Sequence, residues 1–178
     1  KGLNASAALH FGNCIINCMG MASEDMWNRP SSAVSRSSDD FVPNEKNGFR
    51  EHVIQNGYNS LLQGQFYWGD WDMFYTDHRE NRCNSMLRAV SGGPVYVSDK
   101  VGETDPACIW PLIGKDGRII RCDGVGMPTV DCLLTDPVTS GKPLKIWNSF
   151  RECYVLAAFS IHQEMQRCEG AVSVKDIP

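Results

Sequence analysis

The sequence predicts an α/β fold in which parallel βαβ units are followed by an antiparallel β region. Two observations support this. Up to about residue 99, short apolar runs alternate with apolar residues at helical spacing, whereas beyond it Pro and Gly recur and two strand-like runs follow each other. The chain has 178 residues. A complete (β/α)8 barrel takes about 250 residues. About four strands are visible, so residues 1–115 are expected to form part of such a barrel, and residues 116–178 a linker and the start of a C-terminal β domain.

The first predicted βαβ unit lies within residues 14–64. Residues 14–19 (CIINCM) read as a buried strand because Gly12 and Gly20 bound an apolar run. Residues 32–37 form a weaker strand candidate after Pro30. A helix is expected over residues 49–64, because apolar side chains recur there at spacings of three and four. They are Val53, Ile54, Tyr58, Leu61 and Leu62.

The second unit follows directly and repeats the pattern. Residues 65–73 (QFYWGDWDM) read as an aromatic strand that ends in a loop. A helix follows, with an apolar face formed by Cys83, Met86, Leu87 and Val90. Gly92 and Gly93 are expected to end this helix, and residues 94–99 to form the next strand. Strand, helix and strand at this spacing favour parallel pairing.

The last third of the chain changes character. A turn is expected at Asp116–Gly117, leading into residues 118–121. Residues 145–147 and 153–159 are expected to be two strands joined through residues 148–151. These strands would begin an antiparallel β region.

Composition and charge exclude several classes of protein. With 42% hydrophobic and 21% charged residues, the chain has an ordinary globular composition, and its net charge of −4 argues against nucleic acid as a partner. A membrane span is not expected, since no run of eighteen apolar residues occurs. The eight cysteines form no CxxC pair and the four histidines lie far apart, so neither a metal nor a cofactor is expected. A reduced, cytoplasmic protein with buried cysteines is favoured.

Arg36, Asp39 and Asp40 form the first candidate cluster. An arginine close to two carboxylates can keep one of them ionised, while the other lies apart and has a raised pKa. Two acids with different pKa values can then take different roles in proton transfer. The alternative is a helix cap with a surface salt bridge. Spacing alone favours that alternative.

The second candidate cluster is aromatic and acidic and spans residues 67–72 (YWGDWD). Aromatic rings stack on the apolar face of a pyranose, and carboxylates accept hydrogen bonds from its hydroxyls. A sugar therefore suits this mixture better than a nucleotide. The alternative, an aromatic core strand with exposed acids at its tip, is equally compatible with the composition.

Three blocks in this order resemble glycoside hydrolase family 36, in the branch of raffinose synthases and seed-imbibition-type alkaline α-galactosidases. They are residues 36–41 (RSSDDF), 69–74 (GDWDMF) and 93–100 (GPVYVSDK), and the likeness continues through 128–133 and 145–148. The resemblance implies strands five to eight of a (β/α)8 barrel, followed by the beginning of an antiparallel β-sandwich.

The same resemblance implies a site for terminal α-galactosyl groups of raffinose-type oligosaccharides. Asp40 would be the acid/base of a retaining α-galactosidase. Substrate-binding roles would fall to Arg36, Asp39, Trp68, Trp71 and Asp72.

The family's nucleophile lies in a Lys-Val-Asp type motif that this chain does not contain. Retaining hydrolysis needs two carboxyl groups about 5–5.5 Å apart. The chain alone is therefore expected to be inactive and to need the N-terminal half of the barrel as its partner. Its exposed strand edges would also allow oligomers.

Two other functions stay open beside hydrolysis. One is galactosyl transfer to sucrose, as in raffinose synthases. The other is a non-catalytic sugar-binding or assembly subunit.

Overall fold

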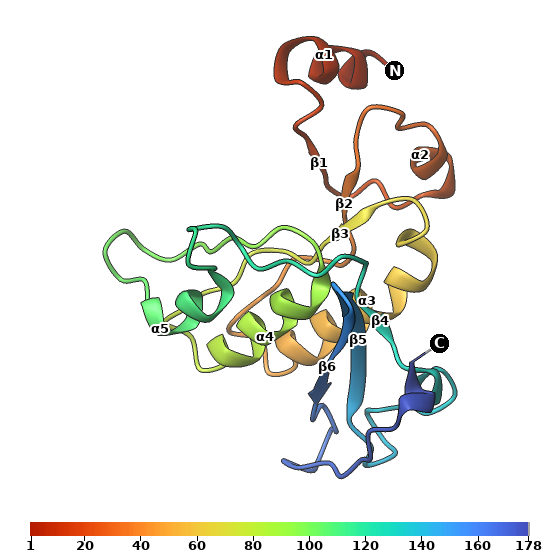
Figure 1. The fold of residues 1–178 in the computed structure, drawn as a ribbon, viewed down its shortest axis with the longest axis vertical. Coiled ribbons are helices and arrows are strands. Elements are labelled where there is room, and N and C mark those ends of the chain that lie inside the picture. The colour runs from red at the N-terminus through yellow and green to blue at the C-terminus, as the bar shows by residue number, and fades with distance from the viewer. Residues whose placement is uncertain (178) are drawn as a thin grey trace.

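A computed structural model describes residues 1–177 and shows two three-stranded sheets with helices between them. In Figure 1 the parallel sheet lies above helices α3 and α4, whereas the antiparallel strands start level with these helices and β5 and β6 extend below them. The α/β character predicted from the sequence is confirmed.

The parallel sheet contains β1 (Ile16–Asn17), β2 (Val34–Arg36) and β3 (Trp68–Asp70), in that order. Both pairings are parallel, with Arg36 opposite Asp70. The βαβ prediction is thus confirmed for three strands, although each is shorter than the segment predicted for it.

Helices α3 (Gly48–Gln63) and α4 (Asn81–Ser91) form where the apolar spacing predicts them. Gly92 ends α4 with a positive φ of 75°, a conformation that glycine adopts without steric cost. The apolar face of α3 is only partly buried, because Val53 is fully enclosed whereas Leu62 is 59% exposed.

The strand predicted over residues 94–99 is present only as a parallel bridge at Val97 and is not a full strand. This segment makes a single parallel bridge, between Phe74 and Val97. Pro94 has no N–H to donate, and the Asp99 carboxylate instead accepts hydrogen bonds from the N–H and hydroxyl of Thr76, at 2.6 and 2.7 Å. Side-chain pairing therefore replaces a ladder of backbone hydrogen bonds.

The antiparallel sheet contains β4 (Met127–Pro128), β5 (Leu144–Phe150) and β6 (Cys153–Phe159). Strands β5 and β6 pair along their full length, from Leu144 opposite Phe159 to Phe150 opposite Cys153. The predicted strand pair is confirmed, but β5 continues to Phe150 and leaves Arg151, at φ 55°, and Glu152 as the turn.

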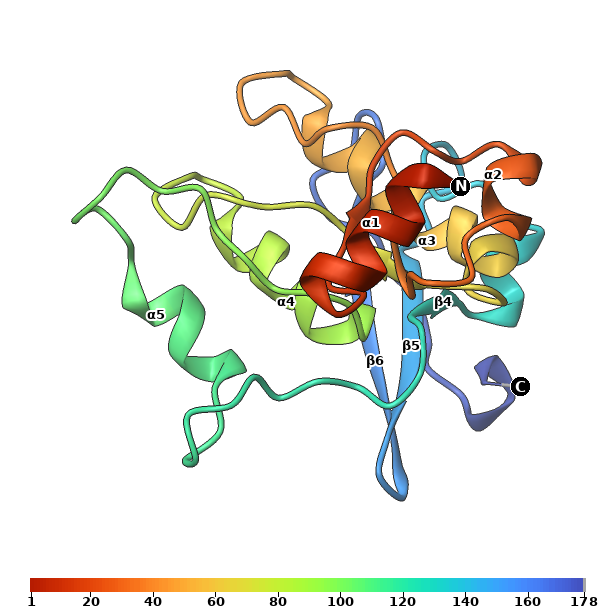
Figure 2. The same ribbon diagram turned by 90° about the horizontal axis from the view of Figure 1, so that it is seen from above.

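Several short elements lie outside the predicted pattern. Figure 2 shows α1 (Gly2–Phe11), which buries only Ala7, in front of the rest of the chain. The others are α2 (Ser23–Trp27), α5 (Pro106–Ile109) and three 3-10 helices, η1 (Trp110–Leu112), η2 (Val130–Leu133) and η3 (Val174–Asp176). The turn expected at Asp116–Gly117 is present, with Gly117 at φ 79°.

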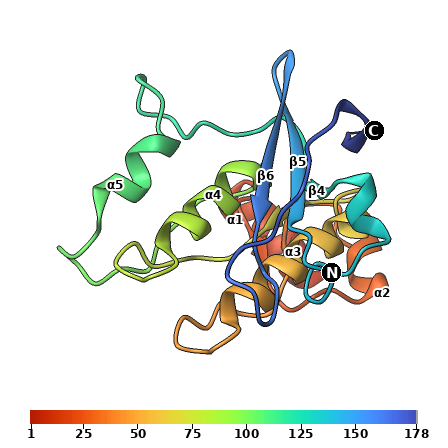
Figure 3. The ribbon, with the colours of Figure 1, turned by 90° about the horizontal axis from the view of Figure 1, so that it is seen from below.

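One hydrophobic core joins the two predicted regions. Trp71, Leu87 and Val53 from the first region pack in the same cluster as Leu144 and Ile146 from the second. Figure 3 shows the β5–β6 hairpin crossing beside α3 and α4. A domain boundary near residue 115 stays a prediction.

All eight cysteines are free thiols. The expected role as small buried side chains holds for Cys108, Cys122 and Cys132. No helix within residues 1–177 is both long and apolar enough to cross a membrane.

Candidate active site

The candidate site is organised around the Arg36 side chain at the carboxyl end of β2. Its guanidinium contacts three carboxylates: Nε lies 3.0 Å from Asp70 Oδ2, one terminal nitrogen 2.8 Å from Asp72 Oδ1 and the other 2.9 Å from Asp40 Oδ1. Burial alone would lower the Arg36 pKa, but the hydrogen bond and charge of Asp70, together with Asp72, outweigh it and raise the pKa. Arg36 is therefore a fixed positive charge among carboxylates.

Asp70 is fully buried and every contact of its carboxylate comes from the site itself. Besides Arg36, it accepts hydrogen bonds from the Tyr96 hydroxyl at 2.9 and 3.0 Å and from the Asp72 N–H at 3.0 Å. Burial, followed by the charge of Asp70, raises the Tyr96 pKa to about 12, so Tyr96 keeps its proton and donates it. Asp70 lies in the predicted cluster of residues 67–72 but has no predicted role of its own, and Tyr96 is not among the predicted site residues.

Asp72 sits at a backbone position that L-residues rarely occupy, with φ at 66°. This turn directs its carboxylate to the N–H of Phe41 at 2.7 Å and the N–H of Met73 at 2.8 Å, in addition to Arg36. The loop after β2 and the loop after β3 are thereby joined through one side chain.

Arg88 of α4 supports this turn from behind. Its guanidinium, which is buried, donates to the carbonyl of Asp72 at 3.1 and 3.2 Å and to that of Met73 at 2.9 Å. It also donates to Asn84 Oδ1 at 2.7 Å. Burial lowers the Arg88 pKa to about 9, which still leaves the side chain charged at neutral pH.

His52 of α3 is the other buried titratable group behind the site. Burial, and then the charge of Arg88, lower its pKa to about 3, so the ring is neutral at pH 7. Its Nε2 lies 2.9 Å from the Trp71 carbonyl and its Nδ1 lies 3.3 Å from the Ser38 hydroxyl. The tautomer with the proton on Nε2 satisfies both contacts. Arg88 Nη2 also lies 3.2 Å from this Nε2, and in this tautomer it donates to the Asp72 and Met73 carbonyls instead.

Asp40 differs from the other carboxylates because its side chain is 73% exposed. Arg36 is its partner at 2.9 Å, so the salt bridge expected from the i, i+4 spacing forms. The helix-cap alternative fails, since α3 begins only at Gly48. Asp39 is also exposed, and its N–H donates to Gln55 Oε1 at 2.8 Å. The structure thus places Asp40 within reach of a ligand, while its acid/base role stays a prediction.

The two predicted tryptophans lie in different surroundings. Trp71 is fully buried in the hydrophobic core and its Nε1 has no hydrogen-bond partner within residues 1–177. Trp68 is half-buried, with the Arg121 guanidinium 5.1 Å from its ring centre. Trp71 fits the core-strand alternative, although the acids beside it are buried rather than exposed.

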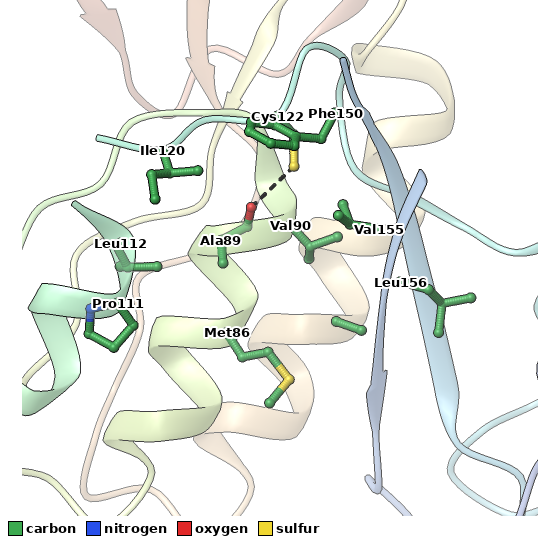
Figure 4. A pocket seen from close by; sticks show the side chains of 11 residues that line it. Met86, Ala89, Val90, Pro111, Leu112, Ile120, Cys122, Phe150, Val155 and Leu156 are labelled. Carbon is green, nitrogen blue, oxygen red and sulfur yellow. Dashed lines mark hydrogen bonds between the residues drawn. The ribbon is translucent and has the colours of Figure 1, made fainter. Parts of the chain in front are cut away.

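Two of the hollows in residues 1–177 are of similar size and differ in their lining. One of about 320 Å³ lies beside Asp40 and has a polar lining. The other, of about 310 Å³, lies between α4, η1 and the β5–β6 hairpin and is lined by Met86, Leu112 and Phe150 among others (Figure 4). In this second hollow Cys122 Sγ donates to the Ala89 carbonyl at 3.3 Å. Its apolar lining does not suit a sugar, whose hydroxyls need polar partners.

Residues 1–177 contain no group of three or more His, Cys, Asp or Glu side chains placed to hold a metal ion. The three carboxylates around Arg36 are paired with that arginine, and their oxygens act as hydrogen-bond acceptors.

These carboxylates lie at and after the carboxyl ends of parallel strands, where α/β folds commonly place their functional residues. Within the α/β class the chain belongs to the family described as raffinose synthase or seed imbibition protein Sip1, which it matches over residues 1–173. The resemblance seen in the sequence is confirmed.

By name, the similar proteins include galactinol–sucrose galactosyltransferases and a stachyose synthase of plants. The chain is 37% identical over 173 residues to the probable galactinol–sucrose galactosyltransferase 1 of Arabidopsis thaliana, covering 96% of this chain and 22% of that protein. It is 40% identical over 170 residues to the galactinol–sucrose galactosyltransferase of Oryza sativa subsp. japonica, covering 89% and 22%. With the stachyose synthase of Pisum sativum the identity is 35% over 182 residues, covering 96% and 20%. The chain thus spans about a fifth of the length of these relatives.

Proposed function

We propose that this chain carries the acid/base part of an enzyme that moves a galactosyl group from an α-galactoside to a sugar hydroxyl. The observation that carries the proposal is the position of Asp40. It is an exposed carboxylate held by Arg36 at the rim of a buried Arg36–Asp70–Asp72 cluster. The names of the relatives favour transfer to sucrose over the hydrolysis expected first from the sequence.

In the proposed reaction Asp40 takes part in two proton transfers: it gives a proton to the leaving group and later accepts one from the acceptor. As the bond between the galactosyl C1 and the bridging oxygen breaks, the Asp40 carboxyl group gives its proton to that oxygen. A nucleophilic carboxylate outside this chain forms an ester bond to C1. An acceptor hydroxyl then attacks C1, its proton passes to Asp40, and the ester bond breaks as the new glycosidic bond forms. Water in place of the acceptor gives hydrolysis.

The other predicted residues divide into those that face a ligand and those that hold the frame. Arg36, Asp39 and Trp68 are proposed to contact the substrate, since each retains some exposed surface. Asp72 is proposed to orient Arg36, because its carboxylate is already bonded to two backbone N–H groups. Trp71 is fully buried and is assigned a packing role.

For the architecture we propose strands five to eight of a (β/α)8 barrel followed by the start of a β-sandwich, with a boundary near residue 115. The parallel order β1-β2-β3 and the bridge between Phe74 and Val97 support the barrel segment. The antiparallel β4–β6 sheet supports the second region. A second carboxylate about 5–5.5 Å from Asp40 would come from the remaining part of the barrel.

The test is product analysis with the full-length protein that contains this chain. Incubation with galactinol and excess sucrose is expected to give a galactosylated sucrose in addition to free galactose. Free galactose alone would favour the hydrolase. Binding of α-galactosides without any turnover would favour the non-catalytic sugar-binding subunit and overturn the proposal.

A further inference from the structure

The polar hollow beside Asp40 lies between the loop after β2 and the first turns of α3. It has a volume of about 320 Å³, which is at the lower end of the range of small-molecule sites. Asp39 and Asp40 line one side, and Glu51 and Gln55 line the other. Both walls belong to elements that also contact the candidate active site: the loop after β2 through Asp40, and α3 through His52.

Asp40 is the residue that joins this hollow to the arginine cluster. It lines the hollow, and its Oδ1 is also 2.9 Å from Arg36, which binds Asp70 and Asp72 on its other nitrogens. A group that protonates a bridging oxygen must lie between the two sugars joined by that oxygen. If the galactosyl group lies at the arginine cluster, the hollow is on the side of the second sugar.

The wall on the α3 side is held in place by contacts to the same loop. Gln55 accepts a hydrogen bond from the Asp39 N–H at 2.8 Å and donates to the Asp39 carboxylate at 3.4 Å. Gly48 lets the loop close on the helix, because a Cβ at this position would collide with the Val42 carbonyl oxygen. The hollow is thus a preformed feature of the loop and helix.

The lining suits a neutral molecule rich in hydroxyl groups. Lys46, Asn47 and Gln55 supply hydrogen-bond donors, and Glu45 and Glu51 supply acceptors, while a sugar hydroxyl both donates and accepts. Four carboxylates line the hollow against one lysine, counting Asp39, Asp40, Glu45 and Glu51 against Lys46. This excess of negative charge would repel a phosphorylated sugar.

We infer that this hollow is the subsite for the acceptor sugar, and that it selects a neutral acceptor over a phosphorylated one. The inference rests on the proposed function, because it takes Asp40 as the acid/base. The leaving group of the donor occupies the hollow first, and the acceptor hydroxyl then reaches C1 from the same side. Glu51, in the first turn of α3, is the side chain best placed to be tested, since it is exposed and forms no ion pair in residues 1–177.

The first measurement is sucrose binding to the full-length protein by saturation-transfer NMR, which needs no turnover. Two variants change the hollow: Glu51→Gln removes a charge, and Glu51→Trp fills the space. Glu169→Gln, on the exposed C-terminal segment, is the matched control. We expect the sucrose signal to fall at least severalfold in Glu51→Trp and to persist in Glu169→Gln. An equal signal in all proteins, or no signal in the unmodified protein, would overturn the inference.

The second measurement is the partition between transfer and hydrolysis with galactinol as donor. Glu51→Gln replaces a charge-assisted hydrogen bond to a sugar hydroxyl with a weaker neutral one, which is expected to raise the KM for sucrose up to about tenfold and to lower the ratio of transfer to hydrolysis. Sucrose 6-phosphate is expected to be a poorer acceptor than sucrose for the unmodified protein. A KM and a ratio within twofold of the unmodified values in both Glu51 variants would overturn the inference. Absence of any galactosyl release from galactinol would instead refute the proposed function.

Discussion

Arg36 and Asp70 are register partners on neighbouring parallel strands, and their side chains form an ion pair with a 3.0 Å contact between Nε and Oδ2. Side chains alternate along a strand, so a shift of one residue in the pairing of β2 with β3 would separate the two. The strand register and the charged cluster therefore depend on each other. This explains how such short strands can hold the site in one arrangement.

Replacement of Arg36 tests that dependence. In Arg36→Met the buried Asp70 carboxylate loses its charged partner, and we expect the free energy of unfolding to fall by about 3–5 kcal/mol. Arg36→Lys should recover only part of this loss, because one ammonium cannot match the three directions of a guanidinium. Denaturant unfolding followed by fluorescence measures the effect. Arg167→Met, at an exposed position, is the control and should stay within about 0.5 kcal/mol of the unmodified protein.

The proposed acid/base role of Asp40 predicts a loss of activity without a loss of stability. Asp40→Asn keeps the shape of the side chain but removes its ability to exchange a proton. We expect galactosyl release from galactinol to fall by about 10²–10⁴-fold. Because Asp40 is 73% exposed, the melting temperature should change little.

Asp39→Asn is the matched comparison for Asp40, since it changes the adjacent carboxylate in the same way. Its effect on galactosyl release should be much smaller. The substitution leaves the Asp39 N–H in place, and this N–H still donates its hydrogen bond to Gln55 Oε1. Turnover of Asp40→Asn at the unmodified rate, measured as free and transferred galactose together, would refute the assignment.

The elements predicted well from the sequence are those with a strong local pattern. Helices α3 and α4 and the β5–β6 hairpin have clear periodicity, and each lies within a few residues of its expected place. Residues 94–99 resemble a strand because they are apolar and β-branched, but the Asp99–Thr76 contacts that prevent a ladder join residues 23 apart. Contacts of that range leave no mark on local periodicity.

Residues of the site could be predicted from the sequence only where they lie together in a short motif. Arg36 and Asp40 stand four apart, and Asp72 lies in an acidic and aromatic run. Asp70 lies in that same run, and its place opposite Arg36 could have been found by aligning the two expected strands. The contact between Arg88 and the Asp72 carbonyl spans 16 residues and uses backbone atoms, so residue types alone could not indicate it.

Gly69 is predicted to be intolerant of a side chain because its strand position is closely packed. A Cβ there would lie 2.6 Å from both Ser37 Oγ and Trp71 Nε1. We expect Gly69→Ala to lower the free energy of unfolding by about 1–3 kcal/mol through overpacking. Gly2→Ala is the control, since a Cβ at that position would have no neighbouring atom within 4 Å. Equal stability of the two variants in thermal unfolding would contradict this close packing.

His52 is predicted to make stability depend on pH. Its pKa is about 3 in the folded protein and about 6.5 when unfolded, so between these values the unfolded chain binds a proton that the folded chain does not. Stability therefore falls as the pH decreases below about 6.5. The contribution of His52 to this fall is about 2 kcal/mol between pH 7 and pH 5, since each pH unit below the unfolded pKa corresponds to about 1.4 kcal/mol.

Other groups titrate in the same range, so the measurement compares the unmodified protein with His52→Gln at both pH values. Gln can still donate to the Trp71 carbonyl but cannot bind a proton. In the variant, protonation at position 52 therefore no longer stabilises the unfolded chain at low pH. The variant should be less stable than the unmodified protein at pH 7 because it loses the packing of the ring against Phe41. Its deficit should then shrink by up to about 2 kcal/mol at pH 5, as the unmodified protein alone loses stability through His52. A deficit that stays constant from pH 7 to pH 5 would mean that His52 takes up its proton as readily in the folded protein as in the unfolded chain.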